Sequence, residues 1–237
     1  MNIQYWLIII NFGSWVVLNV LVLHLVLLQG KTFLERQVNV LKRAGVKDLL
    51  VVGGYRVDLI KEAGFNCMVN PKYESTNMVE TLFRGVSFIE LGGDLIIGYG
   101  DIIYQIDNLN QVLSCEDEIG VMVDRNWRRY WELRFSDPLE DAETFVMDSE
   151  GYVIELGKKA KSFKHIHGQY TGLIKVREDK IKDFIDFYKS LNRNKIYDGK
   201  NFSNMYMTSF LQEIIDAGWK VKAVSVESGW LEIDSVN

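Results

Sequence analysis

After residue 30 the sequence alternates between short apolar runs and amphipathic helical patterns, and this alternation restricts the fold most strongly. The run KDLLVVGG, residues 47–54, is nearly continuous in apolar residues, as in a strand buried on both faces of a parallel sheet. Before it, apolar positions at helical spacing begin at a Thr32–Glu35 capping box and stop at Gly45. The next segments predict helix 57–63, strand 67–69, helix 76–89 and strand 94–99. Repeated alternation of this kind is typical of a doubly wound sheet.

The pattern changes in the middle of the chain. A helix near Leu109 leads to a strand at 119–123, and short β segments then surround a DSEG turn at 148–151. The last elements are expected to be helices at 179–191 and 205–217 and strands at 221–226 and 230–233. The sequence therefore predicts an α/β fold with a doubly wound mixed sheet. It also predicts one domain, 1–237, in which about 125–176 form a small antiparallel β insertion and a return strand.

Length, charge and cysteine content exclude several classes of protein. A chain of 237 residues suits one domain with a large core. The formal net charge of −5 argues against a nucleic-acid partner, because binding to a phosphate backbone depends on clustered Lys and Arg. Cys67 and Cys115 have neither the number nor the spacing of a disulfide framework or a zinc site, which favours a reducing compartment. We therefore expect a cytoplasmic protein.

The first 30 residues contain no Asp, Glu, Lys or Arg, in contrast to the rest of the chain. As a helix, residues 6–28 would span about 35 Å, which exceeds the roughly 30 Å hydrocarbon core of a bilayer. A membrane-anchored binding module is therefore one alternative. Against it, no basic segment precedes the run, and it is interrupted by Asn11, Gly13, Ser14, Asn19 and His24. A membrane partner is the less favoured interpretation.

Two aspartates directly follow apolar strands. Asp101 comes after LIIGYG, with Gly100 beside it, and Asp234 comes after GWLEI. In an open parallel sheet, ligands bind outside the carboxyl ends of the strands. Magnesium is usually held by one or two carboxylates, with water and substrate phosphates completing its coordination, so this pair suits a nucleotide site. The alternative is that both aspartates only cap neighbouring turns.

Two further segments have a structural and a functional interpretation. NPKYESTNM, residues 70–78, offers Ser75 or Thr76 as a helix cap, or a loop whose backbone N–H groups meet a ligand. Trp127, Tyr130 and Trp131 form either a packed aromatic cluster or one wall of a pocket for a cationic group. No GxSxG, HExxH, Walker loop or CxxC motif is present, which excludes common hydrolases, zinc proteases and P-loop enzymes.

From Gln29 onward the chain resembles the nucleotidyltransferases that activate sugar phosphates, phosphocholine and phosphonates. The stretches that carry the resemblance are GKTFLERQVNVLKRAGVKDLLVVGGY, NPKYESTNMVETL, YGD, VMVDRNW, GQYTGLIKV and GWLEID. The resemblance implies a Rossmann-like pyrophosphorylase fold, a nucleoside triphosphate, a magnesium ion on Asp101 and Asp234, and release of pyrophosphate. YESTNM, NWRRYW and MYMTSFLQEIIDAG are similar to the phosphocholine and phosphonate cytidylyltransferase branch, which implies CTP and a small phosphorylated acceptor. The oligomeric state stays open, with a homodimer as one option.

The same resemblance assigns roles to individual residues. Asp101 and Arg125 would be catalytic, with Arg125 neutralising the acceptor's phosphate in a position where relatives often carry lysine. Residues on the nucleotide side, some of them near the base or the acceptor, would be Gly13, Gly54, Tyr55, Ser75, Thr76, Asn77 and Gly100. Residues that line the acceptor pocket would be Trp127, Trp131, Gln169 and Tyr170.

The N-terminus departs from the family, which has a strand, a glycine-rich loop LAAGxGxRL and a PK pair before the first helix. Here the span reads LIIINFGSWVVLNVLVLHLVLLQGKT, in which the strand LIII remains and Gly13 and Ser14 resemble a remnant of the loop. The basic residues that meet the triphosphate are missing, as they would be after a shifted reading frame of about twenty residues that is restored near Gln29. We therefore expect the family core with little nucleotidyl transfer, and a catalytically silent nucleotide-binding relative is a second alternative.

Overall fold

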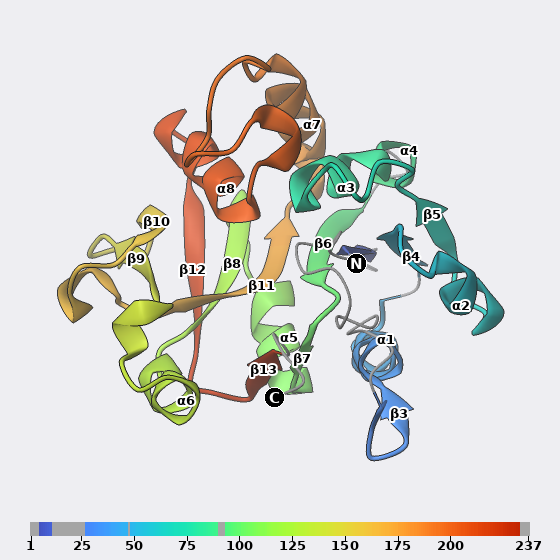
Figure 1. Ribbon diagram of the computed structural model, residues 1–237, viewed down its shortest axis with the longest axis horizontal. Coiled ribbons are helices and arrows are strands. Elements are labelled where there is room, and N and C mark those ends of the chain that lie inside the picture. The colour runs from blue at the N-terminus through green and yellow to red at the C-terminus, as the bar shows by residue number, and fades with distance from the viewer. Residues whose placement is uncertain (1–4, 11–26, 47, 90–92, 233–237) are drawn as a thin grey trace.

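The computed structural model describes residues 5–10, 27–46, 48–89 and 93–232, and its centre is a mixed sheet of seven strands (Figure 1). The strand order is β12-β8-β11-β6-β1-β4-β5. β11 runs antiparallel to both of its neighbours, while the other pairs in this sheet are parallel. The strands are β1 (Tyr5–Ile10), β4 (Asp48–Gly53), β5 (Cys67–Val69), β6 (Asp94–Tyr99), β8 (Ile119–Asp124), β11 (Gln169–Val176) and β12 (Val221–Val226).

β1 lies inside the sheet, between β4 and β6. Its register pairs Leu7 with Leu49 and Ile10 with Val52, so the expected strand LIII is confirmed. A segment cannot be both a sheet strand and a bilayer helix, and the proposed membrane helix from Trp6 to Leu28 is therefore wrong. No helix in the described part of the chain is long and apolar enough to cross a membrane.

Helices cover both faces of the sheet, as the doubly wound pattern predicts. On one face, α3, α4, α7 and α8 pack over Leu50, Val52 and Ile97. On the other, α1, α2, α5 and α6 pack over Val51 and Ile96, because neighbouring strand residues point to opposite faces. Their bounds are α1 Phe33–Arg43, α2 Val57–Glu62, α3 Met78–Arg84, α4 Val86–Ile89, α5 Ile106–Leu113, α6 Trp127–Arg134, α7 Ile181–Ser190 and α8 Met207–Asp216.

The predicted helices are present, with two corrections. The helix expected at 76–89 is divided at Gly85, and its N-cap is Asn77, whose side chain accepts a hydrogen bond from the Met78 N–H. The prediction that Ser75 or Thr76 caps this helix is therefore wrong. The capping box of α1 is confirmed by hydrogen bonds in both directions between Thr32 and Glu35.

Smaller strand pairs and turns complete the fold. The DSEG turn joins β9 (Glu143–Met147) to β10 (Val153–Lys159) in the expected antiparallel hairpin. β7 (Ile102–Tyr104) pairs with β13 (Trp230–Glu232), which brings the C-terminal strand next to the end of β6. A short pair, β2 (Leu27–Leu28) and β3 (Lys31–Thr32), precedes α1. In the described ranges, 3-10 turns occur at Pro138–Glu140, Phe163–His165, Glu178–Lys180 and Phe202–Asn204.

Candidate functional site

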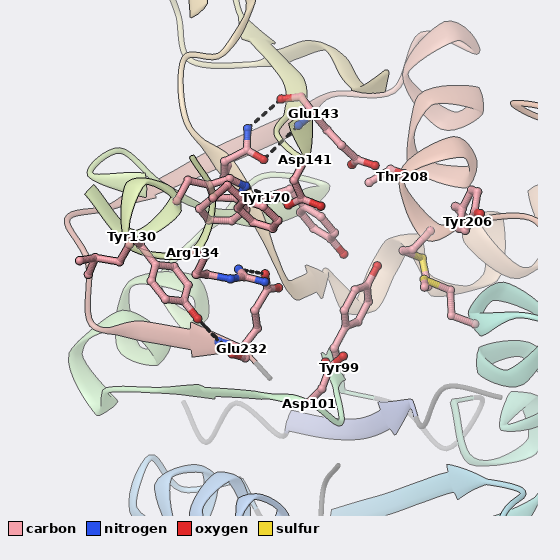
Figure 2. Close-up of a pocket in the computed structure, with 16 residues that line it drawn as sticks. Tyr99, Asp101, Tyr130, Arg134, Asp141, Glu143, Tyr170, Tyr206, Thr208 and Glu232 are labelled. Carbon is pink, nitrogen blue, oxygen red and sulfur yellow. Dashed lines mark hydrogen bonds and ion pairs between the residues drawn. The ribbon is translucent and has the colours of Figure 1, made fainter. Parts of the chain in front are cut away.

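A cavity of about 920 Å³ lies at the carboxyl end of β6. β6 delivers Tyr99 and then Asp101 to it, and the antiparallel β11 delivers Gln169 and Tyr170 from its first residues, because its start lies at the same sheet edge. A volume of this size suits a small-molecule ligand. The cavity is lined by Met78, Tyr99, Asp101, Tyr130, Trp131, Leu133, Arg134, Phe135, Asp141, Glu143, Gln169, Tyr170, Tyr206, Met207, Thr208 and Glu232 (Figure 2).

Two glycines at strand irregularities make room for lining side chains. Gly172 in β11 has φ +82°, and a Cβ there would lie 2.6 Å from the ring of Tyr99. Gly157 in β10 has φ +78°, and a Cβ there would lie 2.4 Å from the Cβ of Thr208. Both conformations favour glycine, and any side chain would displace a cavity residue. The bulges therefore set the positions of Tyr99 and Thr208.

Asp101 lies in the turn between β6 and β7. The buried side chain of Gln37 in α1 holds this turn by donating hydrogen bonds to the carbonyl oxygens of Tyr99, at 2.9 Å, and Ile102, at 2.5 Å. The Oδ1 atom of Asp101 is buried and has no hydrogen-bond partner among the described residues. Burial and the nearby Glu232 carboxylate raise the pKa of Asp101 to about 7.

The surroundings of Asp101 fit one ligand position of a magnesium ion. A buried carboxylate oxygen without a partner is costly unless a cation meets it, and magnesium prefers oxygen ligands. The second predicted ligand, Asp234, lies outside the described residues. Among the residues that are described, no group of three or more His, Cys, Asp or Glu could hold a metal ion. The metal site therefore remains a prediction, with one fitting residue.

Three more carboxylates line the cavity. Asp141 accepts a hydrogen bond from Trp131 Nε1 at 2.9 Å, and Glu232 forms an ion pair with Arg134, with 2.5 Å between Oε1 and Nη1. Glu143 lines the cavity, and its carboxylate has no hydrogen-bond or ion-pair partner among the described residues. Burial by the surrounding protein, followed by the Asp141 charge, raises the pKa of Glu143 to about 7.

The aromatic segment of α6 is partly packed in the core and partly in the cavity wall. Trp127 is buried, packs against Trp131 at 5.8 Å between ring centroids, and does not line the cavity. Tyr130 and Trp131 do line it. However, the guanidinium group of Arg134 lies over both of these rings, 5.0 Å and 5.3 Å from their centroids. The wall is therefore already covered in part by a cation of the protein itself.

The structure brings only part of the predicted site together. Asp101, Trp131, Gln169 and Tyr170 line one cavity. Arg125 is exposed, and the described cavity lining does not include it. Its backbone N–H donates a hydrogen bond to the Val226 carbonyl oxygen at 2.8 Å. Gly13 and Asp234 lie outside the described residues. The lining also does not include Gly54, Tyr55, Ser75, Thr76, Asn77, Gly100 and Trp127.

The segment before α3 is held by Asn70, which is fully buried. Its Nδ2 atom donates to the hydroxyl oxygens of Thr76 and Thr81, each at 2.9 Å, and its Oδ1 accepts from the Lys72 N–H at 3.0 Å. Ser75 is exposed, and Tyr55 is about half exposed. This polar segment therefore has a defined shape and an accessible surface, although it contributes only its neighbour Met78 to the cavity.

Comparison with known proteins gives one close relative and a well-defined fold. No family model matches the chain. It is 42% identical over 215 residues to CTP:phosphoglutamine cytidylyltransferase from Campylobacter jejuni, covering 87% of this chain and 85% of the relative. The inositol-1-phosphate CTP transferase from T. maritima superposes with a TM-score of 0.72 at 18% identity, covering 99% of this chain and 90% of that one. A putative glucose-1-phosphate thymidylyltransferase from Bacillus anthracis gives 0.70 at 13% identity, covering 97% and 89%.

The two solved structures establish the Rossmann-like fold, and the curated relative establishes the family. Identity of 42% over most of both chains cannot be explained by the fold alone. The protein belongs to the nucleotidyltransferase family, close to its cytidylyltransferases.

Proposed function

We propose that the site is built to transfer CMP from CTP to a small phosphorylated acceptor, with release of pyrophosphate. The observation that carries the proposal is the cavity at the carboxyl end of β6, with Asp101 in its wall, in a chain 42% identical to a CTP-dependent cytidylyltransferase. In this reaction an oxygen of the acceptor's phosphate or phosphonate attacks the α-phosphorus of CTP. The bond from that phosphorus to the bridging oxygen breaks, and pyrophosphate leaves with the electron pair.

The residues of the chain contribute positioning and charge, since no covalent enzyme intermediate is needed. Asp101 would hold a magnesium ion together with Asp234, and such an ion neutralises the charge of the nucleotide phosphates. Gln37 fixes the turn that carries Asp101. Trp131, Gln169 and Tyr170 would bound the space in which the acceptor lies.

The acceptor is proposed only as a class, which includes phosphocholine, phosphonates, sugar phosphates and phosphorylated amino acids such as the one in the relative's name. Because nucleoside triphosphates and such acceptors are cytoplasmic metabolites, we also propose the cytoplasm as the compartment.

One observation favours a second candidate, a nucleotide-binding relative without turnover. The first 30 residues contain no lysine or arginine, whereas the family meets the triphosphate with loop N–H groups, an arginine and a lysine. Removal of one preorganised donor typically costs about a hundredfold to a thousandfold in rate. The loss of several donors would bring the turnover of this chain close to background.

Two measurements on the same protein test both candidates. Calorimetry with CTP, UTP, ATP, GTP and dTTP in the presence of magnesium should show a preference for CTP. Preference for another nucleotide, or binding of none, would contradict the proposal. A pyrophosphate-release assay then separates an active enzyme from the silent relative.

A further inference from the structure

The cavity has an excess of negative charge. Its described lining contains the carboxylates of Asp101, Asp141, Glu143 and Glu232, and one guanidinium group, that of Arg134. Arg134 is paired with Glu232. One Asp101 oxygen is buried without a described partner, which is a second indication that a ligand completes the cavity. A phosphorylated acceptor is itself anionic, so this excess has to be explained by the rest of the acceptor or by a metal ion.

The two ends of the cavity differ in what they can bind. In Figure 2 Glu143 lies at the top of the cavity and Asp101 at the bottom, with Arg134 and Glu232 to the left of both. The Asp101 end, next to β6, is where the proposed magnesium ion and phosphates would lie. The Glu143 end is formed by β9, where Glu143 lines the cavity and has Asp141 as a close acidic neighbour. This end is suited to a positive group that lies far from the phosphate.

Two aromatic rings of the cavity wall, those of Tyr130 and Trp131, are not arranged for a quaternary ammonium group. Such groups bind mainly over the faces of aromatic rings, because they have no N–H to donate. The rings of Tyr130 and Trp131 are the obvious candidates, but the Arg134 guanidinium lies over both. The ion pair with Glu232 fixes Arg134 in this position. At these two rings a trimethylammonium group would therefore meet a cation where it needs an aromatic face.

We propose that the acceptor carries, at the end remote from its phosphate, a protonated amine with N–H groups, and that Glu143 recognises this amine. The proposal rests on the proposed function, since it names the acceptor class of the same site. An ammonium N–H can donate a charge-assisted hydrogen bond to the Glu143 carboxylate, which a quaternary ammonium cannot do. A neutral hydroxyl group would leave the acidic end without a counter-charge. Glu143 is thus the residue that selects an acceptor with ammonium N–H groups.

Acceptor binding is tested by calorimetry on the full chain with matched probes. These are aminoalkyl phosphates of increasing length, each with an N-trimethyl and a terminal hydroxyl counterpart. The best aminoalkyl phosphate should bind about tenfold more tightly than both counterparts, as expected for a hydrogen bond to a charged group. Glu143→Gln should abolish this preference while the hydroxyl counterpart binds as before, which shows that the cavity is intact. Glu132→Gln, an exposed carboxylate change on α6 outside the cavity lining, should keep the preference.

Three results would contradict the inference. The trimethyl counterpart could bind as tightly as the amine, or the preference for the amine could survive Glu143→Gln. The third is that no aminoalkyl phosphate binds. CTP binding, measured on the same samples, keeps the two proposals separate. If CTP binds and the amine preference is absent, only this inference fails; if no nucleotide binds, the proposed function fails.

Discussion

Arg134 and Glu232 form an ion pair with 2.5 Å between Nη1 and Oε1, although 98 positions separate them in the sequence. Arg134 ends α6, and Glu232 ends β13. The Tyr130 hydroxyl also donates to the Glu232 carbonyl oxygen, at 3.0 Å. Both side chains of the pair are only about one fifth exposed, at 18% and 22%. The pair therefore fixes the C-terminal strand to the cavity wall and keeps the guanidinium over the aromatic rings.

Arg134→Ala should uncover the rings of Tyr130 and Trp131. We expect phosphocholine to bind more tightly to this variant than to the unaltered chain, and the free energy of unfolding in urea to fall by about 1–3 kcal/mol, because Glu232 loses its partner. Arg128→Ala removes an exposed arginine from the same helix, which is paired with Glu132, and should change stability by less than about 1 kcal/mol. Equal effects of the two substitutions would show that Arg134 has no special role.

Gln37→Ala should weaken the turn that carries Asp101. Two hydrogen bonds to buried carbonyl oxygens are lost, so the free energy of unfolding should fall by about 1–3 kcal/mol. Magnesium-dependent CTP binding should weaken as well, because Asp101 is no longer held in place. Asn39→Ala, at an exposed position of the same helix, is the control for both measurements. A Gln37 variant with normal nucleotide binding would mean that the turn keeps its shape without this contact.

Asp101→Asn should affect stability and function in opposite directions. Because one Asp101 oxygen is buried without a described partner, a neutral side chain should raise the free energy of unfolding in the absence of magnesium. At the same time, loss of the carboxylate should lower magnesium-dependent transfer by about a hundredfold or more in any active form of the protein. Asp107→Asn, an exposed aspartate in α5, should change neither quantity. Unchanged magnesium binding in Asp101→Asn would exclude Asp101 as a ligand.

Acceptor binding should depend on the charge of Glu143. Burial and nearby carboxylates raise the pKa of Glu143 to about 7, so its carboxylate gains charge as the pH rises through 7. The charges of three carboxylates raise the pKa of Glu143, namely those of Asp141, Asp198 and Glu232. The Glu143 charge in turn raises the pKa of Tyr99 and Tyr170. An aliphatic amine stays protonated over this range, so its affinity should increase from pH 6 to pH 8. The phosphate and Asp101 also titrate in this range, so the quantity to follow is the difference in affinity between the aminoalkyl phosphate and its hydroxyl counterpart. In Glu143→Gln this difference should not change with pH; a difference that still grows would assign the effect to another group.

Much of the fold follows from local sequence patterns. The apolar run before Gly54 and the capping box at Thr32 predict β4 and the start of α1, because both signals lie within a few residues of the element. The sequence pattern does not predict the division of one helix at Gly85, since a single glycine is tolerated in many helices. The pattern predicts a mixed sheet with a return strand within about 125–176, but not the place of β11 between β8 and β6, because a buried strand has the same apolar pattern wherever it lies in the sheet.

The site was harder to predict than the fold. Asp101 was found because it follows a strand, and Gln169 and Tyr170 through the resemblance. The sequence does not indicate Glu143 or Arg134, because they enter the cavity only through the packing of β9 and α6 against the sheet edge. Glu232 does have a signal in the sequence. It belongs to the same GWLEID stretch as Asp234, and β13 brings it to Arg134.

Exchange of the N-terminal segment tests whether the absence of the glycine-rich loop keeps nucleotidyl transfer low. Residues 5–10 form a sheet strand, so the exchange is confined to 11–28 and introduces a glycine-rich loop with one arginine and one lysine. Pyrophosphate release is then measured with CTP, magnesium and a phosphorylated acceptor. We expect turnover near background for the unaltered chain and an increase of at least about a hundredfold after the exchange, since preorganised donors return to the triphosphate. Robust turnover by the unaltered chain, or no transfer after the exchange, would contradict this expectation.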